Sequence, residues 1–173
     1  MNIFVLDNDP LISARMMDCQ RVPKMCVESA QMMACAVIEW GATPDEMPLT
    51  QKGTPYSGGY KHHPCSRWAS ECLENFIWLS RHALELCLEY HRRFNKRHAC
   101  HDPIIKLYGL GLNYIEECGE MTPFAQAMPD EYKDDDAVKA YREYYKSKDN
   151  VHYRHTQAPH WFEPAVVDLF SFV

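Results

Sequence analysis

The sequence lacks several features that would place it in a common class of protein. No apolar run approaches the roughly 20 residues that cross a bilayer, and no basic N-terminal stretch leads into the apolar segment of a signal peptide. CxxC and HExxH spacings, GxGxxG and GxxxxGK(S/T) loops and a nucleophile-elbow serine are also missing, so zinc-finger, metalloprotease, dinucleotide, P-loop and acyl-transfer chemistry are unsupported. These absences predict a soluble, cytoplasmic protein without a membrane partner.

Cysteine, by contrast, is abundant, with eight among 173 residues. Without a secretory signal, a framework of disulfides is disfavoured, and reduced thiols are expected. Five of the cysteines fall inside apolar patterns of helical period, which predicts that they are buried: Cys19, Cys26, Cys35, Cys72 and Cys87.

The net charge of −6 argues against broad, non-specific binding to a polyanion, but the charge is unevenly distributed. Residues 52–108 carry nine Lys and Arg against five Asp and Glu, and they hold six of the nine histidines. The segments on either side are acidic. A phosphate-bearing partner is therefore expected to meet the central third, and the acidic C-terminal third is expected to face solvent.

The periodicity of apolar residues predicts a mostly α protein of one compact domain, residues 1–173, with two long packed helices and a third, shorter helix. Residues 2–6 form a short apolar run, expected as an extended N-terminal arm. Asp9-Pro10 is typical of a helix start, Gly41 of a helix end, and Pro23 is expected to kink the helix between them. The expected helices span 10–40, 64–94, 103–118 and 134–148, and residues 42–63, rich in Gly and Pro, are expected to form an irregular loop.

A polar stripe interrupts the first expected helix. Arg21, Lys24, Glu28 and Gln31 lie at offsets of 0, 3, 7 and 10, so on a helix they share one face. Two cations and a carboxylate in this arrangement can hold a phosphate and perform acid–base chemistry. The alternative is a solvated face with an ordinary Lys24–Glu28 ion pair.

A second cluster, Gly58-Gly59-Tyr60-Lys61-His62-His63-Pro64, lies at the start of the next expected helix. Glycines permit a close backbone approach, and a helix N-terminus beside Lys and His attracts anions. The alternative is an ordinary loop with surface histidines. The basic run at 92–98 likewise fits either a phosphate-binding surface or the capping of a helix end by cations.

Histidine and cysteine also raise the question of a metal. Zinc ligands could come from the following residues: His62, His63, Cys65, His98, Cys100 and His101. Their spacing matches no known zinc motif, so the sequence favours a protein without a bound metal ion.

Several motifs in serial order resemble the pyrimidine-dimer DNA glycosylase (endonuclease V-like) family. They are the pattern D-x-x-R-x-P-K-x-x-x-E-x-x-Q from Asp18 to Gln31, Gly-Tyr-x-x-His-Pro at 59–64, Trp68 in the second helix, and Pro-His-Trp at 159–161. The chain also resembles a group of small phage proteins that open with NIFVLDxDP, which would place it in the host cytoplasm.

The resemblance implies a helical protein that docks on DNA, flips out a damaged or modified base and requires no cofactor. In that family the N-terminal α-amine attacks the deoxyribose and a helix glutamate assists. Here Arg21 occupies the position of that glutamate, and Asn2 is large enough to leave Met1 in place, so Glu28 becomes the expected carboxylate and Met1 the expected amine.

The expected catalytic residues are thus Glu28, Met1 and Arg21. The expected partner is DNA or a nucleotide, and the residues expected to bind it are Lys24, Gln31, Tyr60, Lys61, His62, His63 and Trp68. The alternative function is a catalytically inactive, phage-type module that binds a nucleotide or a protein on the same scaffold. A third possibility is a base- or nucleotide-modifying enzyme that uses the same pocket.

Overall fold

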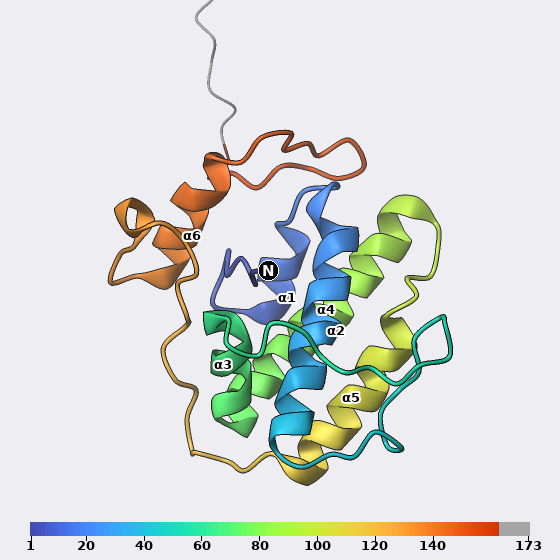
Figure 1. Ribbon diagram of the computed structural model, residues 1–173. Coiled ribbons are helices and arrows are strands. Elements are labelled where there is room, and N and C mark those ends of the chain that lie inside the picture. The colour runs from blue at the N-terminus through green and yellow to red at the C-terminus, as the bar shows by residue number, and fades with distance from the viewer. Residues whose placement is uncertain (163–173) are drawn as a thin grey trace, which may run out of the picture.

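The computed structural model describes residues 1–162 and is built from helices, as the periodicity predicted (Figure 1). Within these residues the only β-pairing is an isolated bridge between Leu49 and Pro55. The helices are α1 (Pro10–Arg15), α2 (Arg21–Glu39), α3 (Pro64–Glu71), α4 (Leu73–Phe94), α5 (His101–Tyr114) and α6 (Ala137–Lys146), with a 3-10 turn at Asp130–Tyr132. No helix among the described residues is both long and apolar enough to cross a membrane.

The prediction of one kinked helix over 10–40 is wrong, because the chain leaves the helix after Arg15 and starts a new one at Arg21. Pro23 lies in the first turn of α2, where its missing N–H deprives no carbonyl of a partner. The buried Asp18 carboxylate accepts the backbone N–H groups of Gln20 at 2.8 Å and of Arg21 at 3.3 Å. The proline therefore helps to begin a helix instead of bending one.

The second predicted long helix is also two helices, since Cys72 adopts an extended conformation (φ −163°, ψ 169°) between α3 and α4. No glycine or proline marks this break. The segment around Thr122 takes over the hydrogen bonding: the Leu73 N–H donates to the Glu116 carbonyl at 2.9 Å, and the Thr122 N–H donates to the Asn75 side chain at 3.0 Å. Tertiary contacts thus override a continuous helical pattern.

The two longest helices, α2 and α4, pack against each other as predicted, and α1, α3 and α5 also pack on this pair (Figure 1). Residues 2–6 form the predicted arm, which is buried against the helices. Residues 42–63 form the predicted loop, which runs across α2 in Figure 1. All eight cysteines are free thiols, and seven of them are buried.

Candidate active site

The N-terminal arm places Met1 beside the middle of α2, and Asn2 fixes that position. The Asn2 side chain is buried and donates from Nδ2 to the Ala127 carbonyl at 2.9 Å. Its Oδ1 accepts the N–H groups of Ile3 at 2.8 Å and Phe4 at 3.2 Å. Each polar atom of the Asn2 side chain is therefore engaged, and the backbone before it has little freedom to move.

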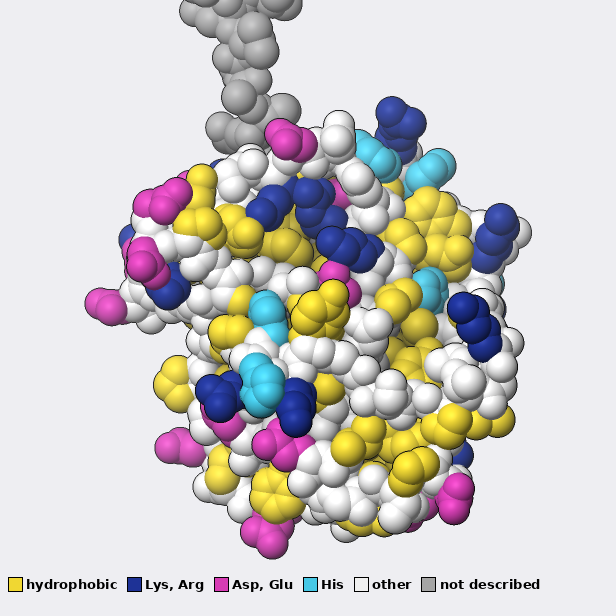
Figure 2. Space-filling view, viewed as in Figure 1, with side chains coloured by type: hydrophobic (Ala, Val, Ile, Leu, Met, Phe, Trp, Pro, Cys, Tyr) yellow, Lys and Arg dark blue, Asp and Glu magenta, His cyan; other side chains and the backbone are white. Residues whose placement is uncertain are grey.

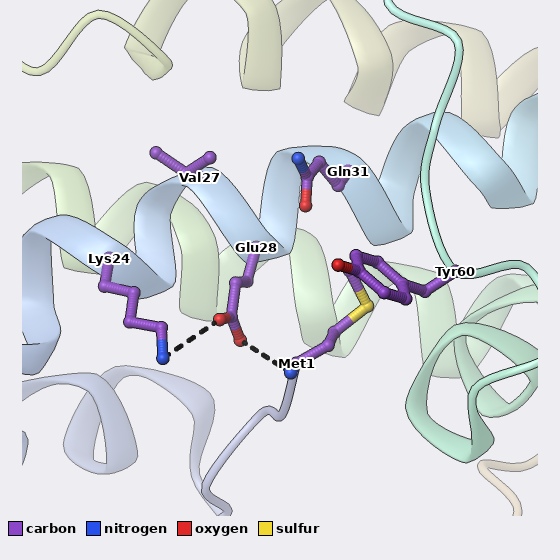
Figure 3. Close-up of a pocket in the computed structure, with 6 residues that line it drawn as sticks. All are labelled: Met1, Lys24, Val27, Glu28, Gln31 and Tyr60. Atoms are coloured by element: carbon purple, nitrogen blue, oxygen red, sulfur yellow. Dashed lines mark ion pairs between the residues drawn. The ribbon is translucent and has the colours of Figure 1, made fainter.

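Glu28 on α2 receives the end of the arm. Its Oε2 accepts the Asn2 N–H at 2.8 Å and lies 3.8 Å from the α-amino nitrogen of Met1, while Lys24 Nζ lies 3.5 Å from Oε1 (Figure 3). The Glu28 side chain is 12% exposed, whereas that of Lys24 is 69% exposed. The carboxylate is thus oriented by the backbone, and the lysine that pairs with it is exposed enough to reach a ligand.

A pocket of about 360 Å³ lies above these groups, within the size range of about 300–1,000 Å³ seen for small-ligand sites. Figure 3 shows Gln31 one turn further along α2 and the ring of Tyr60 close to the Met1 side chain. The pocket is lined by Met1, Lys24, Val27, Glu28, Gln31 and Tyr60. Five of the residues singled out from the sequence therefore line one cavity.

Tyr60 reaches this pocket because its loop is fastened to α2 at Cys35. The Gly59 N–H donates to the Cys35 sulfur, and the thiol lies 3.1 Å from the Gly59 carbonyl. Gly58 has φ +70°, and a Cβ there would lie 2.6 Å from the Cys35 sulfur. Only glycine satisfies both the backbone angle and the contact. Tyr60 itself, with φ +58°, is 72% exposed over the pocket.

Arg21 lies beside the pocket, in an adjoining hollow of about 210 Å³ that also contains Lys24 and Glu28. Its guanidinium is held by Asp18, with Nη1 2.8 Å from Oδ2, and it donates to the Asp149 carbonyl at 3.2 Å. The ring of Tyr145 lies 5.2 Å from the guanidinium carbon. Arg21 is therefore a fixed cation at the edge of the site, in a hollow that Met1 also lines.

His63 lies close enough to the site to feel its charges. Burial lowers the pKa of His63, the charge of the Met1 amine lowers it further, and Glu28 raises it. Its Nδ1 accepts the Cys65 N–H at 3.2 Å and so caps the start of α3. The cap to the Cys65 N–H fixes the orientation of the His63 ring.

The remaining expected binding residues lie elsewhere. Lys61 and His62 line a separate hollow of about 340 Å³ with Arg67 and Glu39. Trp68 is 1% exposed, and its indole N–H donates to the Thr122 carbonyl at 3.3 Å, so it belongs to the core and does not reach the pocket. The sequence pattern placed it correctly on a buried helix face, and only the resemblance suggested a contact with a ligand.

The basic run at 92–98 is largely occupied by contacts within the protein. Arg92 pairs with Glu85 and Glu89, and Arg97 pairs with Asp102. Arg93 is buried, pairs with Glu89 and donates to the carbonyls of Arg15, the last residue of α1, and of Met17, just after it. Structural pairing thus accounts for these arginines.

Two residues of the site were missed because they come from α6 and from the residues just after it. Tyr144 and Lys148 line the hollow beside Arg21, and Lys148 Nζ lies 3.5 Å from the centre of the Tyr144 ring. No local motif marks them, and the acidic composition of the C-terminal third pointed away from them. Figure 2 shows Lys and Arg side chains gathered where α2 and α6 approach each other.

Comparison with known proteins assigns the family. Residues 1–102, more than half of the chain, match the family model described as pyrimidine dimer DNA glycosylase, so the chain belongs to this family. The matched residues include α2, Glu28 and the Tyr60–Pro64 loop, but not α6. No curated protein and no solved structure gave a match.

Proposed function

We propose that this protein is a DNA glycosylase and lyase that acts on a damaged or modified base, with the α-amine of Met1 as nucleophile. The observation that carries the proposal is the pairing of this amine with Glu28, 3.8 Å away, at the edge of an open pocket. Family membership supports DNA as the substrate, because the family is that of a DNA glycosylase.

The chemistry requires only groups that the site contains. The unprotonated Met1 nitrogen attacks C1′ of the deoxyribose, the bond from C1′ to the base breaks, and the base leaves with the bonding electrons. The C1′–O4′ bond then breaks, O4′ takes up a proton, and the Met1 nitrogen and C1′ form a protonated imine. Loss of a C2′ proton to a general base then expels the 3′ phosphate. No cofactor takes part in these steps.

Glu28 has two tasks in this scheme. An ammonium group cannot attack a carbon atom, and the Glu28 carboxylate is the nearest base that can take the proton from the amine. Later, the carboxylate stabilises the positive charge of the protonated imine. The Asn2 N–H, donating at 2.8 Å, keeps Oε2 directed at the end of the chain.

Phosphate binding falls to the cations around the pocket. Lys24 is exposed beside Glu28, and Arg21 and Lys148 line the adjoining hollow. Lys61, His62 and Arg67 form a second basic group near the start of α3, visible in Figure 2 as Lys, Arg and His side chains gathered together. Two cationic groups on either side of the pocket fit a DNA strand whose backbone passes across it.

A second candidate function is binding without catalysis. Arg21 stands where the family has its catalytic glutamate, and its guanidinium is occupied by Asp18. A protein that kept the scaffold but lost the carboxylate would bind a nucleotide or a protein and would form no imine. The two functions differ in one measurable property, the covalent intermediate.

Borohydride trapping tests the proposal. The protein is mixed with DNA that carries a single abasic site, borohydride is added, and the covalent complex is quantified on a denaturing gel. We expect an adduct with the wild type, its mass placed on Met1 by peptide analysis. Glu28→Gln should lower the trapping rate by about 100-fold, within the range for loss of a positioned acid–base group.

Glu117→Gln is the matched control, because it removes an exposed carboxylate outside the pocket and should trap at the wild-type rate. An unreactive wild type that still binds the DNA would select the binding function. Equal trapping by wild type and Glu28→Gln would remove Glu28 from the mechanism. Nicking of ultraviolet-irradiated DNA, measured with the same variants, extends the test from the lyase step to base removal.

A further inference from the structure

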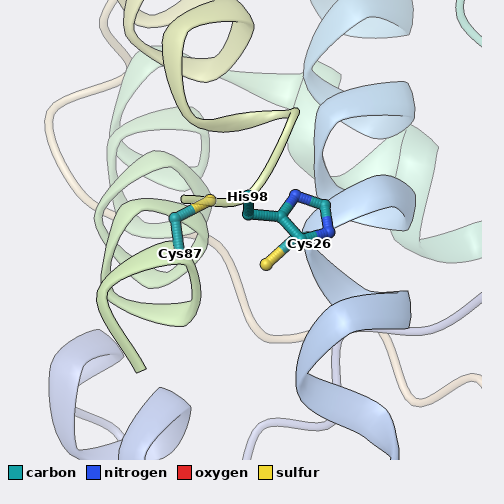
Figure 4. A group of neighbouring side chains, drawn as sticks. All are labelled: Cys26, Cys87 and His98. Atoms are coloured by element: carbon teal, nitrogen blue, oxygen red, sulfur yellow. The ribbon is translucent and has the colours of Figure 1, made fainter. Parts of the chain in front are cut away.

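Three potential metal ligands that are distant in the sequence converge behind the active site. Cys26 lies on α2, Cys87 on α4 and His98 in the connection between α4 and α5, and Figure 4 shows the two sulfurs and the imidazole facing a common space. One ligand atom from each lies within 4.8 Å of the other two. We propose that Cys26, Cys87 and His98 form a binding site for one zinc ion.

The chemistry of the three groups suits zinc. Zinc is bound in proteins by thiolates at about 2.3 Å and imidazole nitrogens at about 2.0–2.1 Å in tetrahedral geometry, so ligand atoms of one site lie within about 4 Å of each other. The ligand atoms of Cys26, Cys87 and His98 lie within 4.8 Å of one another, so they must move somewhat closer together to reach that geometry. Two thiolates, one neutral imidazole and a divalent ion carry no net charge, so the complex can remain in the core.

The hydrogen bonds of the His98 ring are compatible with zinc binding. Its Nδ1 accepts the Cys100 N–H at 3.1 Å, so the neutral ring carries its proton on Nε2. The Pro23 carbonyl lies beside the same ring as a hydrogen-bond partner. Metal-bound histidines commonly donate the N–H of their second ring nitrogen to a carbonyl. His98 Nδ1 can then give up its hydrogen bond with the Cys100 N–H and bind zinc.

The ion also has a path to the site. Cys26 is 0% and Cys87 2% exposed, but His98 lines a surface pocket of about 860 Å³ together with Tyr56 and Cys100. Zinc would enter past the imidazole, and a water from the pocket would complete the four ligands. The two thiol protons leave to solvent as the zinc–sulfur bonds form.

Cobalt(II) serves as the spectroscopic probe for this site. The experiment uses the full chain with Cys118→Ser, because Cys72, Glu74 and Cys118 form a second group of potential ligands. We expect one cobalt ion per chain, with thiolate-to-cobalt absorption in the near ultraviolet that disappears on addition of zinc. Two protons should be released per ion, and the Tm should rise with zinc concentration.

In this background Cys87→Ser and His98→Gln should weaken cobalt binding by on the order of 100-fold or more, since second-shell changes alone cost about 10–100-fold. Cys19→Ser, which removes a buried thiol outside the cluster, should bind as the parent does. If Cys87→Ser fails to fold, His98→Gln decides, because His98 is half-buried. Absence of the thiolate band, or its persistence in His98→Gln with unchanged affinity, would overturn the site.

Discussion

His82 on α4 is a buried histidine whose ring makes no hydrogen bond within residues 1–162. It stacks on Trp78 with ring centroids 5.1 Å apart, and burial lowers its pKa to about 3. The unfolded chain binds a proton at this residue below a pH of about 6.5, while the folded protein stays neutral there down to about 3. The contribution of His82 to stability is therefore present above about pH 6.5 and is lost as the pH falls.

His82→Phe should remove this pH dependence. Over the range from about pH 6 to pH 4, the free energy of unfolding of the wild type should fall more steeply than that of the variant, by on the order of 1.4 kcal/mol per pH unit. Urea unfolding at several pH values measures the difference. The exposed His91→Phe, on the same helix, should follow the wild type. Parallel curves for wild type and His82→Phe would mean that the ring is hydrated or protonated in the folded state.

At the level of single residues, the sequence predicted which side chains lie on the same face of a helix. The shared face of Lys24, Glu28 and Gln31 follows from their spacing, and all three line one pocket. The meeting of Met1 with Glu28 does not follow from spacing, because the path of the arm depends on the bond from Asn2 to Ala127, 125 positions away. Only the family resemblance suggested that an amine and a carboxylate would meet.

At the level of elements, Gly58 is the residue on which the Tyr60 loop depends. Gly58→Ala would place a Cβ 2.6 Å from the Cys35 sulfur at φ +70°, so the loop must move away from α2. We expect a loss of stability above the roughly 1 kcal/mol that a left-handed alanine costs by itself. Binding of abasic-site DNA should weaken too, because Tyr60 leaves the pocket.

Gly53→Ala separates the two causes. Gly53 has a similar φ of +76° but no atom within 4 Å of an added Cβ, so it reports the cost of the backbone angle alone. Thermal unfolding and DNA titration of both variants make the comparison. Equal losses of stability, with DNA binding intact in both, would show that the contact with Cys35 does not hold the loop.

The two predicted long helices show that the periodicity of apolar residues does not predict where a helix ends. The apolar residues on both sides of Pro23 predict a kink within one helix, but the same proline suits a first helical turn once Asp18 accepts the N–H groups of Gln20 and Arg21. The break at Cys72 carries no local signal, because the Leu73 N–H donates to the carbonyl of Glu116, which is distant in the sequence. Helix faces could thus be predicted, whereas helix ends depended on distant partners.

Across the whole molecule, the residues beyond the family match complete the site formed by residues 1–102. Tyr145 donates its hydroxyl to the buried Asp18, and Arg142 donates to the Leu6 carbonyl at 2.9 Å. The contact of Arg142 holds α6 against the N-terminal arm, that of Tyr145 holds α6 against the residues before α2, and the bond from Asn2 to Ala127 fastens the arm to the segment before α6. The position of the Met1 amine therefore depends on a segment that the matched region does not contain.

The same segment supplies Lys148, which faces Arg21 and Lys24 across the smaller hollow. If the protein binds DNA as proposed, Lys148 neutralises one phosphate, even though the C-terminal third is acidic overall. Lys148→Gln should then weaken binding of abasic-site DNA at low salt and reduce the magnitude of the slope of log K against log salt concentration by about 1.

Fluorescence anisotropy titrations at four or more salt concentrations provide the slope for each variant. Lys139→Gln is the control on α6, which ends two residues before Lys148, because Lys139 pairs with Asp134 away from the hollow and should keep the wild-type slope. A smaller slope for Lys148→Gln alone places a phosphate at the segment just after α6, outside the family match. An unchanged slope, with weaker binding only through loss of the contact with Tyr144, would restrict the DNA-binding surface to the first 102 residues.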